Sequence, residues 1–396
     1  MMILVLNSGS SSVKFQLFNM ENEEVIAKGR VARIGEDTSR LKLQKGNDKI
    51  DREIKVNNHT GAIKLIKDYL LDGEKGVIES INEITAIGHR VVHGGEEISE
   101  PTIIDDEVEE LIDDLSSLAP LHNPHNLTGI KVCKEVIPDT PQVAVFDTGF
   151  HQTLPETAYM YALPYKYYEK YKIRRYGFHG TSHKYVAQRA ADLMNEPLDS
   201  LKIITLHLGN GASITAVKEG KSVDTSMGLT PLEGLVMGTR SGDIDPSLVP
   251  FLAENEGISS GEVEDILNNE SGLLGVSGIS NDFRELKQAA DNDEKRAKLA
   301  LKLFYYRIKK YIGAYMAAMG GTDAIVFTGG IGENEAPARE EIMEGLEYTG
   351  ARLDKDANQV KGEEKEISAP DSTIKLFTIP TNEELVIARA AQELID

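Results

Sequence analysis

The stretch ILVLNSGSSSVKF (residues 3–15) decides the fold class of this chain. An apolar run ends in a turn of small polar residues and glycine, and a second run, VKFQLF (13–18), follows. This order predicts two β-strands joined by a tight turn. The stretch LKIITLHLGNGASITAV (201–217) has the same order, and an offset of 202 places Gly9 on Gly211 and Ser11 on Ser213. We therefore expect two related halves in the chain.

Around these two stretches, segments of strand character alternate with segments of helical character. We expect further strands over 23–31, 84–92, 142–146, 323–328 and 374–379. We expect helices from Asn58 or Thr60 to a stop at Gly73, and over 105–118, 124–136, 293–319 and 382–394. This alternation is typical of an α/β protein with substantial parallel pairing. A length of 396 residues fits two domains, and the repeat puts their boundary near residue 150.

Composition excludes several classes of protein. The chain has 43 Lys and Arg against 64 Asp and Glu, a net charge of −21, which argues against nucleic acid or an anionic membrane as a partner. An anionic ligand would need positive charge concentrated locally. No window approaches the roughly 18 apolar residues of a membrane span, and the N-terminus lacks the basic region of a signal peptide. The only cysteine, Cys133, is expected to be a buried thiol in a reducing cytoplasm.

Three turns rich in small residues follow predicted strands, at residues 7–12, 209–213 and 329–334. Small residues let backbone N–H groups approach phosphate oxygens closely. A single turn of this kind is more often an ordinary hairpin, but three of them favour phosphate binding. The sequence has no G-x-x-x-x-G-K-[ST] loop, no complete dinucleotide fingerprint and no protein-kinase motifs, so a nucleotide site would belong to another architecture.

Four charged or titratable residues lie beside such turns. Arg90 interrupts an apolar strand before two glycines, and Arg240 lies in a polar loop, MGTRSGDIDP. Arginine suits bidentate contacts with carboxylate or phosphate. His179 precedes a helix in a small-residue loop, and Asp147 ends a strand at the sheet edge where α/β proteins place their sites. Histidine pairs such as His179 and His183 lack a third metal ligand, so we do not expect a histidine metal site.

Eight segments together resemble the acetate kinase family over essentially the whole chain. They are VLNSGSSSVKF (5–15), GHRVVHGG (88–95), FDTGFH (146–151), GFHGTSH (177–183), HLGNGAS (207–213), MGTRSGDIDP (237–246), TGGIGEN (328–334) and TNEE (381–384). Gly149 stands where the family is expected to have alanine, a small-for-small difference.

The resemblance implies the fold of the sugar kinase/heat-shock chaperone/actin superfamily. That fold has two related actin-like (ribonuclease H-like) α/β domains with an ATP cleft between them. Residues 1–149 with 384–396 would form the first domain, to which the C-terminal helix returns, and residues 150–383 the second, with the nucleotide-binding loops. The resemblance also implies a cytoplasmic homodimer that uses ATP/ADP and Mg²⁺, with Mn²⁺ as an alternative metal, on acetate and acetyl phosphate.

The resemblance assigns roles to individual residues. The catalytic residues would be Arg90, Asp147, His179 and Arg240. Arg90 would also bind the acetate carboxylate, and the pocket for the acetate methyl would be formed by Val92, Leu121, Phe178 and Pro231. The metal would be held by Asn7 and Glu383, partly through water. The nucleotide would be bound by Lys14, His207, Leu208, Gly209, Asn210, Gly211, Asp282, Phe283, Arg284, Gly330, Ile331, Gly332, Glu333 and Asn334.

The chemistry of a carboxylate acceptor shapes the mechanism. Transfer of a phosphoryl group asks mainly for positioning and charge stabilisation, so we expect direct in-line transfer. An acid with a pKa of about 4 is already ionised at neutral pH and needs no base. Asp147 is therefore expected to orient an arginine or a metal-bound water. Two alternatives remain at this point: a propionate kinase of the same family, and an actin-like or chaperone-like ATP-driven assembly protein.

Overall fold

The computed structural model describes residues 1–73, 76–120 and 122–396. The chain forms two compact units. Unit 1 comprises Met1–Gly149 and Asn382–Asp396, and unit 2 comprises Phe150–Thr381. Leu121, assigned above to the methyl pocket, lies outside the described residues. Among those residues, no helix is long and apolar enough to cross a membrane.

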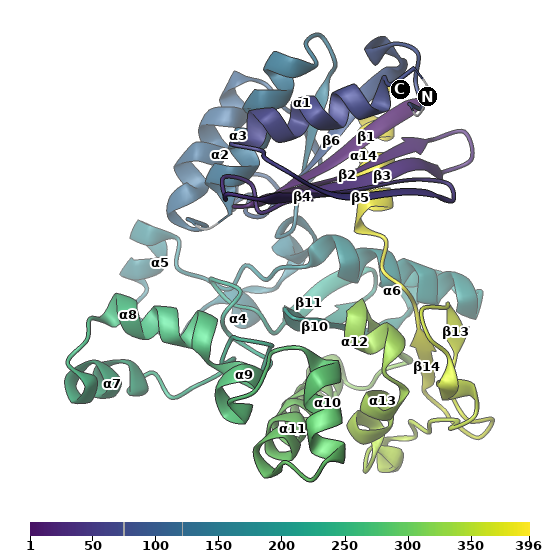
Figure 1. The fold of residues 1–396 in the computed structure, drawn as a ribbon. Helices are drawn as coiled ribbons and strands as arrows, with labels where there is room; N and C mark the ends of the chain where they lie inside the picture. Colours follow the sequence, from purple (N-terminus) through teal and green to yellow (C-terminus); the bar gives the residue numbers. More distant parts are fainter. Residues whose placement is uncertain (74–75, 121) are drawn as a thin grey trace. The chain divides into compact units, whose positions relative to one another are not determined.

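Unit 1 is built on one mixed sheet with strand order β5-β4-β3-β2-β1-β6-β8-β7 (Figure 1). The strands are β1 (Met2–Ser8), β2 (Ser12–Asn19), β3 (Glu24–Ala32), β4 (Ser39–Lys45), β5 (Asp48–Ile54), β6 (Ile84–Val91), β7 (Thr102–Ile103) and β8 (Gln142–Phe146). The first five form antiparallel neighbours, whereas β1, β6 and β8 run parallel. Parallel strands end at the same edge of a sheet, so the residues after β1, β6 and β8 lie near one another.

Helices cover both faces of this sheet. The helices of unit 1 are α1 (His59–Leu70), α2 (Asp106–Asp114), α3 (Asn123–Val136) and α14 (Glu383–Ile395). Apolar residues of α1 and α3, including buried Cys133, pack against Val13, Phe15 and Leu17 of β2. The last helix, α14, packs on the other face, where Gly88 gives room for Ile387: a Cβ on Gly88 would lie 2.5 Å from Ile387 Cγ2. Residues Asn382–Asp396, which include α14, belong to the same compact unit as Met1–Gly149.

Unit 2 is built on a second mixed sheet, with strand order β11-β10-β9-β12-β14-β13. Figure 1 labels β10, β11, β13 and β14 of this sheet. Its strands are β9 (Lys202–Leu208), β10 (Ala212–Lys218), β11 (Lys221–Thr225), β12 (Ala324–Thr328), β13 (Lys365–Glu366) and β14 (Lys375–Thr378). Its helices are α4 (Glu156–Tyr159), α5 (Lys166–Tyr171), α6 (Gly180–Met194), α7 (Leu248–Glu256), α8 (Ser260–Asp265), α9 (Gly272–Ser277), α10 (Phe283–Asp291), α11 (Lys295–Met319), α12 (Gly329–Asn334) and α13 (Ala336–Met343). Val186 and Ala190 of α6 pack against Ile203 and Val326 in one of its buried clusters.

The two sheets share a topology. The order β3-β2-β1-β6-β8 in unit 1 matches β11-β10-β9-β12-β14 in unit 2, with an antiparallel hairpin followed by parallel strands. This confirms the prediction of two related α/β halves. The predicted offset of 202 is wrong, however, because β1 ends at Ser8 and β9 at Leu208, which makes Gly9 the equivalent of Gly209. Ser8 pairs with Val13 in unit 1 and Leu208 with Ala212 in unit 2, so the first hairpin has one more residue between its paired strands, and aligning identical glycines and serines gave the wrong offset.

Most predicted elements are present, and the structure adds further short strands and helices; two of the differences have a clear physical cause. Strands β4 and β5 were not predicted, because charged residues occupy most of β5 and hide its alternation. The glycine-rich segment 329–334, expected to be a turn, forms the short helix α12. Glu333 explains this helix, because its Oε1 accepts hydrogen bonds from Gly329 N at 2.9 Å and from Thr328 Oγ1 at 3.3 Å. One side chain thereby satisfies backbone and hydroxyl donors at the start of the helix.

Candidate active site

The first group of predicted site residues lies at one edge of the unit 1 sheet. Arg90 is the second-last residue of β6, and Asp147 directly follows β8, the parallel neighbour of β6. Asn7 lies on β1, whose Leu6 pairs with His89 of β6. Lys14 on β2 is the cross-strand partner of Asn7. The topology of the sheet therefore gathers residues that are far apart in the sequence.

Arg90 and Asp147 form a bidentate ion pair. Arg90 Nε donates to Asp147 Oδ1 at 2.9 Å, and Arg90 Nη2 donates to Asp147 Oδ2 at 2.6 Å. Burial alone would lower the pKa of Arg90, but the charges of Asp147 and Glu383 raise that pKa above its ordinary value. Asp147 is 2% exposed and the Arg90 side chain 21%, so the guanidinium is the partner that can still be reached. The two bonds to Asp147 fix the position of the Arg90 guanidinium. Its third nitrogen, Nη1, has no hydrogen bond to any described residue.

Glu383 is the first residue of α14, at the end of the helix that faces this group. The preceding Asn382 caps the helix, with its Oδ1 accepting from Leu385 N at 3.2 Å. The charge of the Glu383 carboxylate raises the pKa of Arg90, after that of Asp147. Unit 1 thus brings together Asn7, Glu383, Arg90 and Asp147, which supply amide, carboxylate and guanidinium groups.

Two buried asparagines of α3 hold the segment after β6, and sequence reasoning missed both. Asn126 Oδ1 accepts from Val92 N at 3.1 Å, and its Nδ2 donates to Ser8 O at 2.8 Å. Asn123 makes two bonds with the His93 backbone, each 3.0 Å long. Asn126 therefore ties the segment that bears Val92 to the residue after Asn7. Polar residues of a helix usually face solvent. The one available signal in the sequence was that Asn123 and Asn126 occur in a segment expected to be a helix that packs on the sheet.

The second group of predicted site residues lies in unit 2, around the start of α6. His179 precedes α6 with φ 57°, a conformation that non-glycine residues adopt at a cost on the order of 1 kcal/mol. Its ring stacks on that of His207, with 4.2 Å between centroids and 21° between planes. His207 is held by Ser182, whose Oγ lies 2.8 Å from His207 Nδ1. The two imidazoles are therefore fixed in a parallel arrangement.

A chain of hydrogen bonds runs from Thr205 through His183 and Ser213 to His179. His183 Nδ1 lies 2.7 Å from Thr205 Oγ1, and its Nε2 lies 2.7 Å from Ser213 Oγ. Burial holds the pKa of His183 well below its usual value, so this ring is neutral and donates through only one of its two nitrogens. Ser213 Oγ also lies 2.9 Å from His179 Nδ1.

The direction of this chain determines how His179 can act. When Ser213 Oγ accepts from His179 Nδ1, Nε2 of His179 carries a proton only if the ring is an imidazolium. His183 is fully buried with both ring nitrogens hydrogen-bonded. It nonetheless acts on the predicted site through Ser213, a residue that sequence reasoning did not assign.

Arg240 lies beside His179 in the same unit. A Cβ on Gly211 would lie 3.6 Å from His179 Cε1 and 3.7 Å from Arg240 Nη1, so Gly211 borders both side chains. Arg240 Nη1 donates to Pro231 O at 3.4 Å, and burial lowers the pKa of Arg240. Gly238 N donates to Asn210 O at 2.9 Å and joins the Arg240 loop to the turn after β9. This arrangement places a cation next to a glycine with no side chain in the way.

The predicted nucleotide residues occupy three segments of unit 2. The turn after β9 and helix α12 begin side by side, because Thr328 pairs with His207. Asp282 caps α10, and a hydrogen bond from Arg284 lowers the pKa of Asp282 to about 2. Asn281 Nδ2 donates to Asn210 Oδ1 at 2.9 Å, which links the third segment to the first.

Not every side chain in these segments is available to a ligand. The Phe283 side chain is buried, with its ring 5.9 Å from that of Phe304. Leu208 is likewise fully buried. The Glu333 carboxylate is occupied by Gly329 and by Thr381 N, which donates to Oε1 at 3.1 Å. These three residues could contact a nucleotide through their backbone.

The residues assigned to the methyl pocket fall into both units. Val92, half-buried, directly follows β6 in unit 1. Phe178 in unit 2 is 3% exposed, and its carbonyl accepts from His151 Nε2 at 3.0 Å. Pro231 is half-buried beside Arg240 in the same unit.

Comparisons with known proteins agree along the whole chain. Residues 2–389 match the model of the acetokinase family. The chain is 60% identical to acetate kinase of Halothermothrix orenii, with 100% of both proteins covered. It is similar to the crystal structure of Porphyromonas gingivalis acetate kinase, with a TM-score of 0.96, 47% identity and 100% of both chains covered. It is also similar to a propionate kinase from Francisella tularensis, with a TM-score of 0.93, 44% identity and 99% of both chains covered.

Proposed function

The chain belongs to the acetokinase family, and from this premise we propose that it transfers the γ-phosphoryl group of ATP reversibly to acetate, giving acetyl phosphate and ADP. The observation that carries the proposal is 60% identity to an acetate kinase over the full length of both proteins. A phosphotransferase of this kind acts on a carboxyl group and uses ATP and ADP as co-substrates. The roles below are the ones that the geometry of each unit supports.

We propose that Arg90 binds the acetate carboxylate. Two of its five N–H groups go to Asp147, and the donors on Nη1 remain for a substrate oxygen. Asp147 fixes the plane of the guanidinium, so the carboxylate meets donors whose orientation is already set. Orientation of this kind lowers the entropy cost of bringing the reactants together. Asp147 acts here as an orienting group, because acetate needs no base.

We propose that Arg240 and His179 stabilise the phosphoryl group during transfer. Negative charge spreads over three equatorial oxygens in such a transition state, and fixed cations lower its energy. Arg240 and Nε2 of His179 both border Gly211, where a phosphoryl oxygen can approach without meeting a side chain. Loss of one such charged donor costs on the order of 10²–10⁵ in rate. The phosphoryl group passes directly from ATP to acetate.

The family implies a divalent metal, and Asn7 and Glu383 fit Mg²⁺ or Mn²⁺. Both offer oxygen atoms, which are the ligands these ions prefer. Mg²⁺ in kinases keeps water and phosphate oxygens in its shell, so one carboxylate and one amide are a sufficient protein contribution. The effect of the Glu383 charge on the pKa of Arg90 supports a position for this carboxylate near the proposed acetate-binding group. When bound, the metal would neutralise charge on the phosphates of the nucleotide.

We propose that the nucleotide is bound by Lys14 of unit 1 and by the three segments of unit 2 described above. Gly211, Gly330 and Gly332 would offer backbone N–H groups, and Arg284, whose side chain is 80% exposed, its guanidinium. Gly209, whose N–H donates to Gly211 O at 3.1 Å, would let the nucleotide approach the turn closely. We propose further that the protein is a cytoplasmic homodimer. The domain assignment is also a proposal, with residues 1–149 and 384–396 as the first domain and 150–383 as the second.

A propionate kinase is the second candidate, because the solved propionate kinase is 44% identical and equally complete in its coverage. The proposal is tested by incubating the protein with ATP, Mg²⁺ and acetate, propionate or butyrate, and by trapping acyl phosphate with hydroxylamine. We expect hydroxamate formation to be most efficient with acetate. A higher kcat/KM for propionate would make the second candidate correct. ATP hydrolysis without acid-dependent hydroxamate would leave the assembly-protein alternative.

A further inference from the structure

Unit 1 carries a concentration of positive charge on the face of β2–β5 that is not packed against α1. Lys14, Lys28, Arg30, Lys42 and Lys49 line a hollow of about 370 Å³ on this face, together with Asp51 and Glu384. Five cations against two carboxylates leave an excess of three positive charges around the hollow. The chain as a whole has a net charge of −21, so this local excess runs against its composition.

The register of the strands places these cations directly opposite one another. Lys14 of β2 pairs with Arg30 of β3, and Arg30 pairs with Lys42 of β4. Three like charges thus form one row across three neighbouring strands, and its ends are about 10 Å apart at the usual strand spacing. Like charges directly opposite in a sheet destabilise it. The row of three cations therefore lowers the stability of the sheet, so stability does not account for it.

A second row lies one residue pair further along the same face. Gln16 of β2 pairs with Lys28 of β3, Lys28 with Gln44 of β4, and Gln44 with Lys49 of β5. Lysines on an edge strand can protect the sheet from unwanted pairing. That explanation covers Lys49 on β5, but β3 lies between β2 and β4 inside the sheet. Lys28 and Arg30 therefore need another reason.

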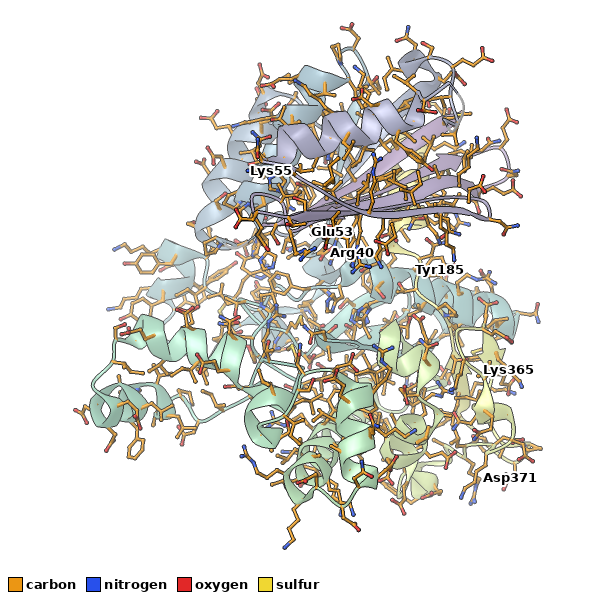
Figure 2. All side chains as sticks on the ribbon, viewed as in Figure 1. Arg40, Glu53, Lys55, Tyr185, Lys365 and Asp371 are labelled. Carbon is orange, nitrogen blue, oxygen red and sulfur yellow. The ribbon has the colours of Figure 1, made fainter. Side chains whose placement is uncertain are left out.

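Available carboxylates do not neutralise these cations. Asp51 accepts from Arg40 at 2.8 and 2.9 Å and lies 3.2 Å from Lys42, so it is already shared by two cations. Arg40 and its cross-strand partner Glu53 lie on the same face (Figure 2). Within the described part of the chain, Lys28, Arg30 and Lys49 make no ion pair, although all three are exposed.

We propose that the basic face, defined as Lys28, Arg30, Lys42 and Lys49, binds an inorganic polyphosphate chain in this hollow, where it adjoins the proposed nucleotide site only at Lys14. Two rows of cations match an extended anion with several charges better than a single compact one. Most members are lysines, whose flexible point charges suit tetrahedral phosphates. The buried Phe15 is the only aromatic residue around the hollow, so it offers no platform on which a base could stack. This feature favours inorganic polyphosphate over a nucleotide or a nucleic acid.

The test is a calorimetric titration of the whole protein with inorganic tripolyphosphate, without divalent ions and at low salt. It is run with and without saturating ADP, which occupies the proposed nucleotide site. We expect a binding event that persists with ADP, weakens as salt is added and is weaker with orthophosphate. Binding that ADP abolishes would belong to the nucleotide site and would overturn the proposal, as would no binding at all.

Two variants separate this site from a general effect of charge. Arg30→Gln should weaken tripolyphosphate binding roughly tenfold, the usual loss for one charge-assisted contact. The control Lys64→Gln removes one exposed cation from α1 of the same unit and should leave the affinity unchanged. Arg30→Gln should also raise the Tm in the absence of anion, because it removes the central charge of the row. Equal weakening in both variants, or unchanged affinity in Arg30→Gln, would overturn the proposal. The kcat and KM of both variants should stay within about twofold of wild type, so a failure of the kinase assignment remains distinguishable.

Discussion

Arg90 and Asp147 are joined by two hydrogen bonds, 2.9 and 2.6 Å long, that use one edge of the guanidinium and leave Nη1 for a ligand. The carboxylate is almost completely buried, while the guanidinium keeps 21% of its surface. The ion pair therefore holds the Arg90 guanidinium in a fixed orientation, and only the guanidinium is partly exposed. Its two members come from the ends of adjacent parallel strands, so the sheet itself sets their distance.

Replacement of Asp147 by asparagine should lower kcat/KM for acetate on the order of 10²-fold, because the Arg90 guanidinium loses its charged support. The acidic limb of the pH profile should keep its position, since the carboxylate does not act as a base. The matched control is Asp51→Asn, which alters another bidentate arginine–aspartate pair, with Arg40, on the protein surface. It should leave kcat/KM unchanged. A limb present in wild type and absent in Asp147→Asn would contradict the orienting role.

Replacement of Ser213 by alanine should change the pH dependence of kcat. We infer that Ser213 Oγ accepts from His179 Nδ1 in wild type, so donation from Nε2 needs the imidazolium. Without Ser213, the neutral ring can place its proton on Nε2. We expect the alkaline limb of the kcat profile to move to higher pH. Thr215→Val removes a neighbouring buried hydroxyl that bonds Thr225 and should leave the limb in place. An unmoved limb in Ser213→Ala would show that His179 does not donate through Nε2.

Buried histidines should make the protein less stable as the pH falls from about 6.5. Burial lowers the pKa of His89 and of His151 to about 4 from an ordinary 6.5. The unfolded chain binds these protons below about pH 6.5 and the folded protein does not, so each group costs about 1.4 kcal/mol per pH unit in this window. Above pH 6.5 the two histidines have no effect on the pH dependence.

The measurement is the Tm by calorimetry between pH 7.5 and 5, a range in which most carboxylates stay ionised. Wild type should lose stability more steeply with falling pH than His151→Asn, whatever their difference at pH 7.5. Parallel curves would mean that His151 is protonated in the folded protein.

Replacement of Val92 by alanine should shift acid preference towards longer chains. One methylene in an apolar pocket changes the barrier by about 1–3 kcal/mol, so the propionate-to-acetate ratio of kcat/KM should rise roughly tenfold. The backbone should stay in place, because Asn126 holds the Val92 N–H. Val25→Ala, at an exposed strand position, should leave the ratio unchanged. An unaltered ratio in Val92→Ala would place the methyl pocket elsewhere.

The fold could be predicted from the sequence where apolar residues dominate a strand. ILVL is a continuous buried run and VKFQLF alternates apolar and polar residues, and both form strands. Strand β4 was missed although SRLKLQK alternates, because only two of its residues are apolar. Strand β5, DKIDREI, faces the core only with the partly buried Ile50 and Ile54, so its signal is weak. Helix α12 was expected to be a turn because its glycines hide the role of Glu333, which is set by atoms of Thr328 and Gly329.

The candidate site could be predicted only as a set of positions. Motifs identified Arg90, Asp147, His179 and Arg240, but no spacing rule gives the bidentate geometry of the first two or the left-handed backbone of His179. Asn126 and Ser213 could not be found at all. Their roles depend on contacts with residues more than thirty positions away, which only the folded chain brings together.

Helix α14 has a consequence for the order in which the protein is made. The chain leaves unit 1 after Gly149, builds all of unit 2, and re-enters unit 1 only at Asn382. Until the last residues leave the ribosome, the sheet of unit 1 therefore lacks the helix that covers Gly88, and an apolar surface that Ile387 will occupy stays open to water. Glu383, at the start of that helix, also arrives last. A chain that ends before residue 383 would keep Arg90 and Asp147 but lack Glu383, one of the two proposed metal ligands. Such truncated products should be inactive, and their exposed apolar surface should make them prone to aggregation.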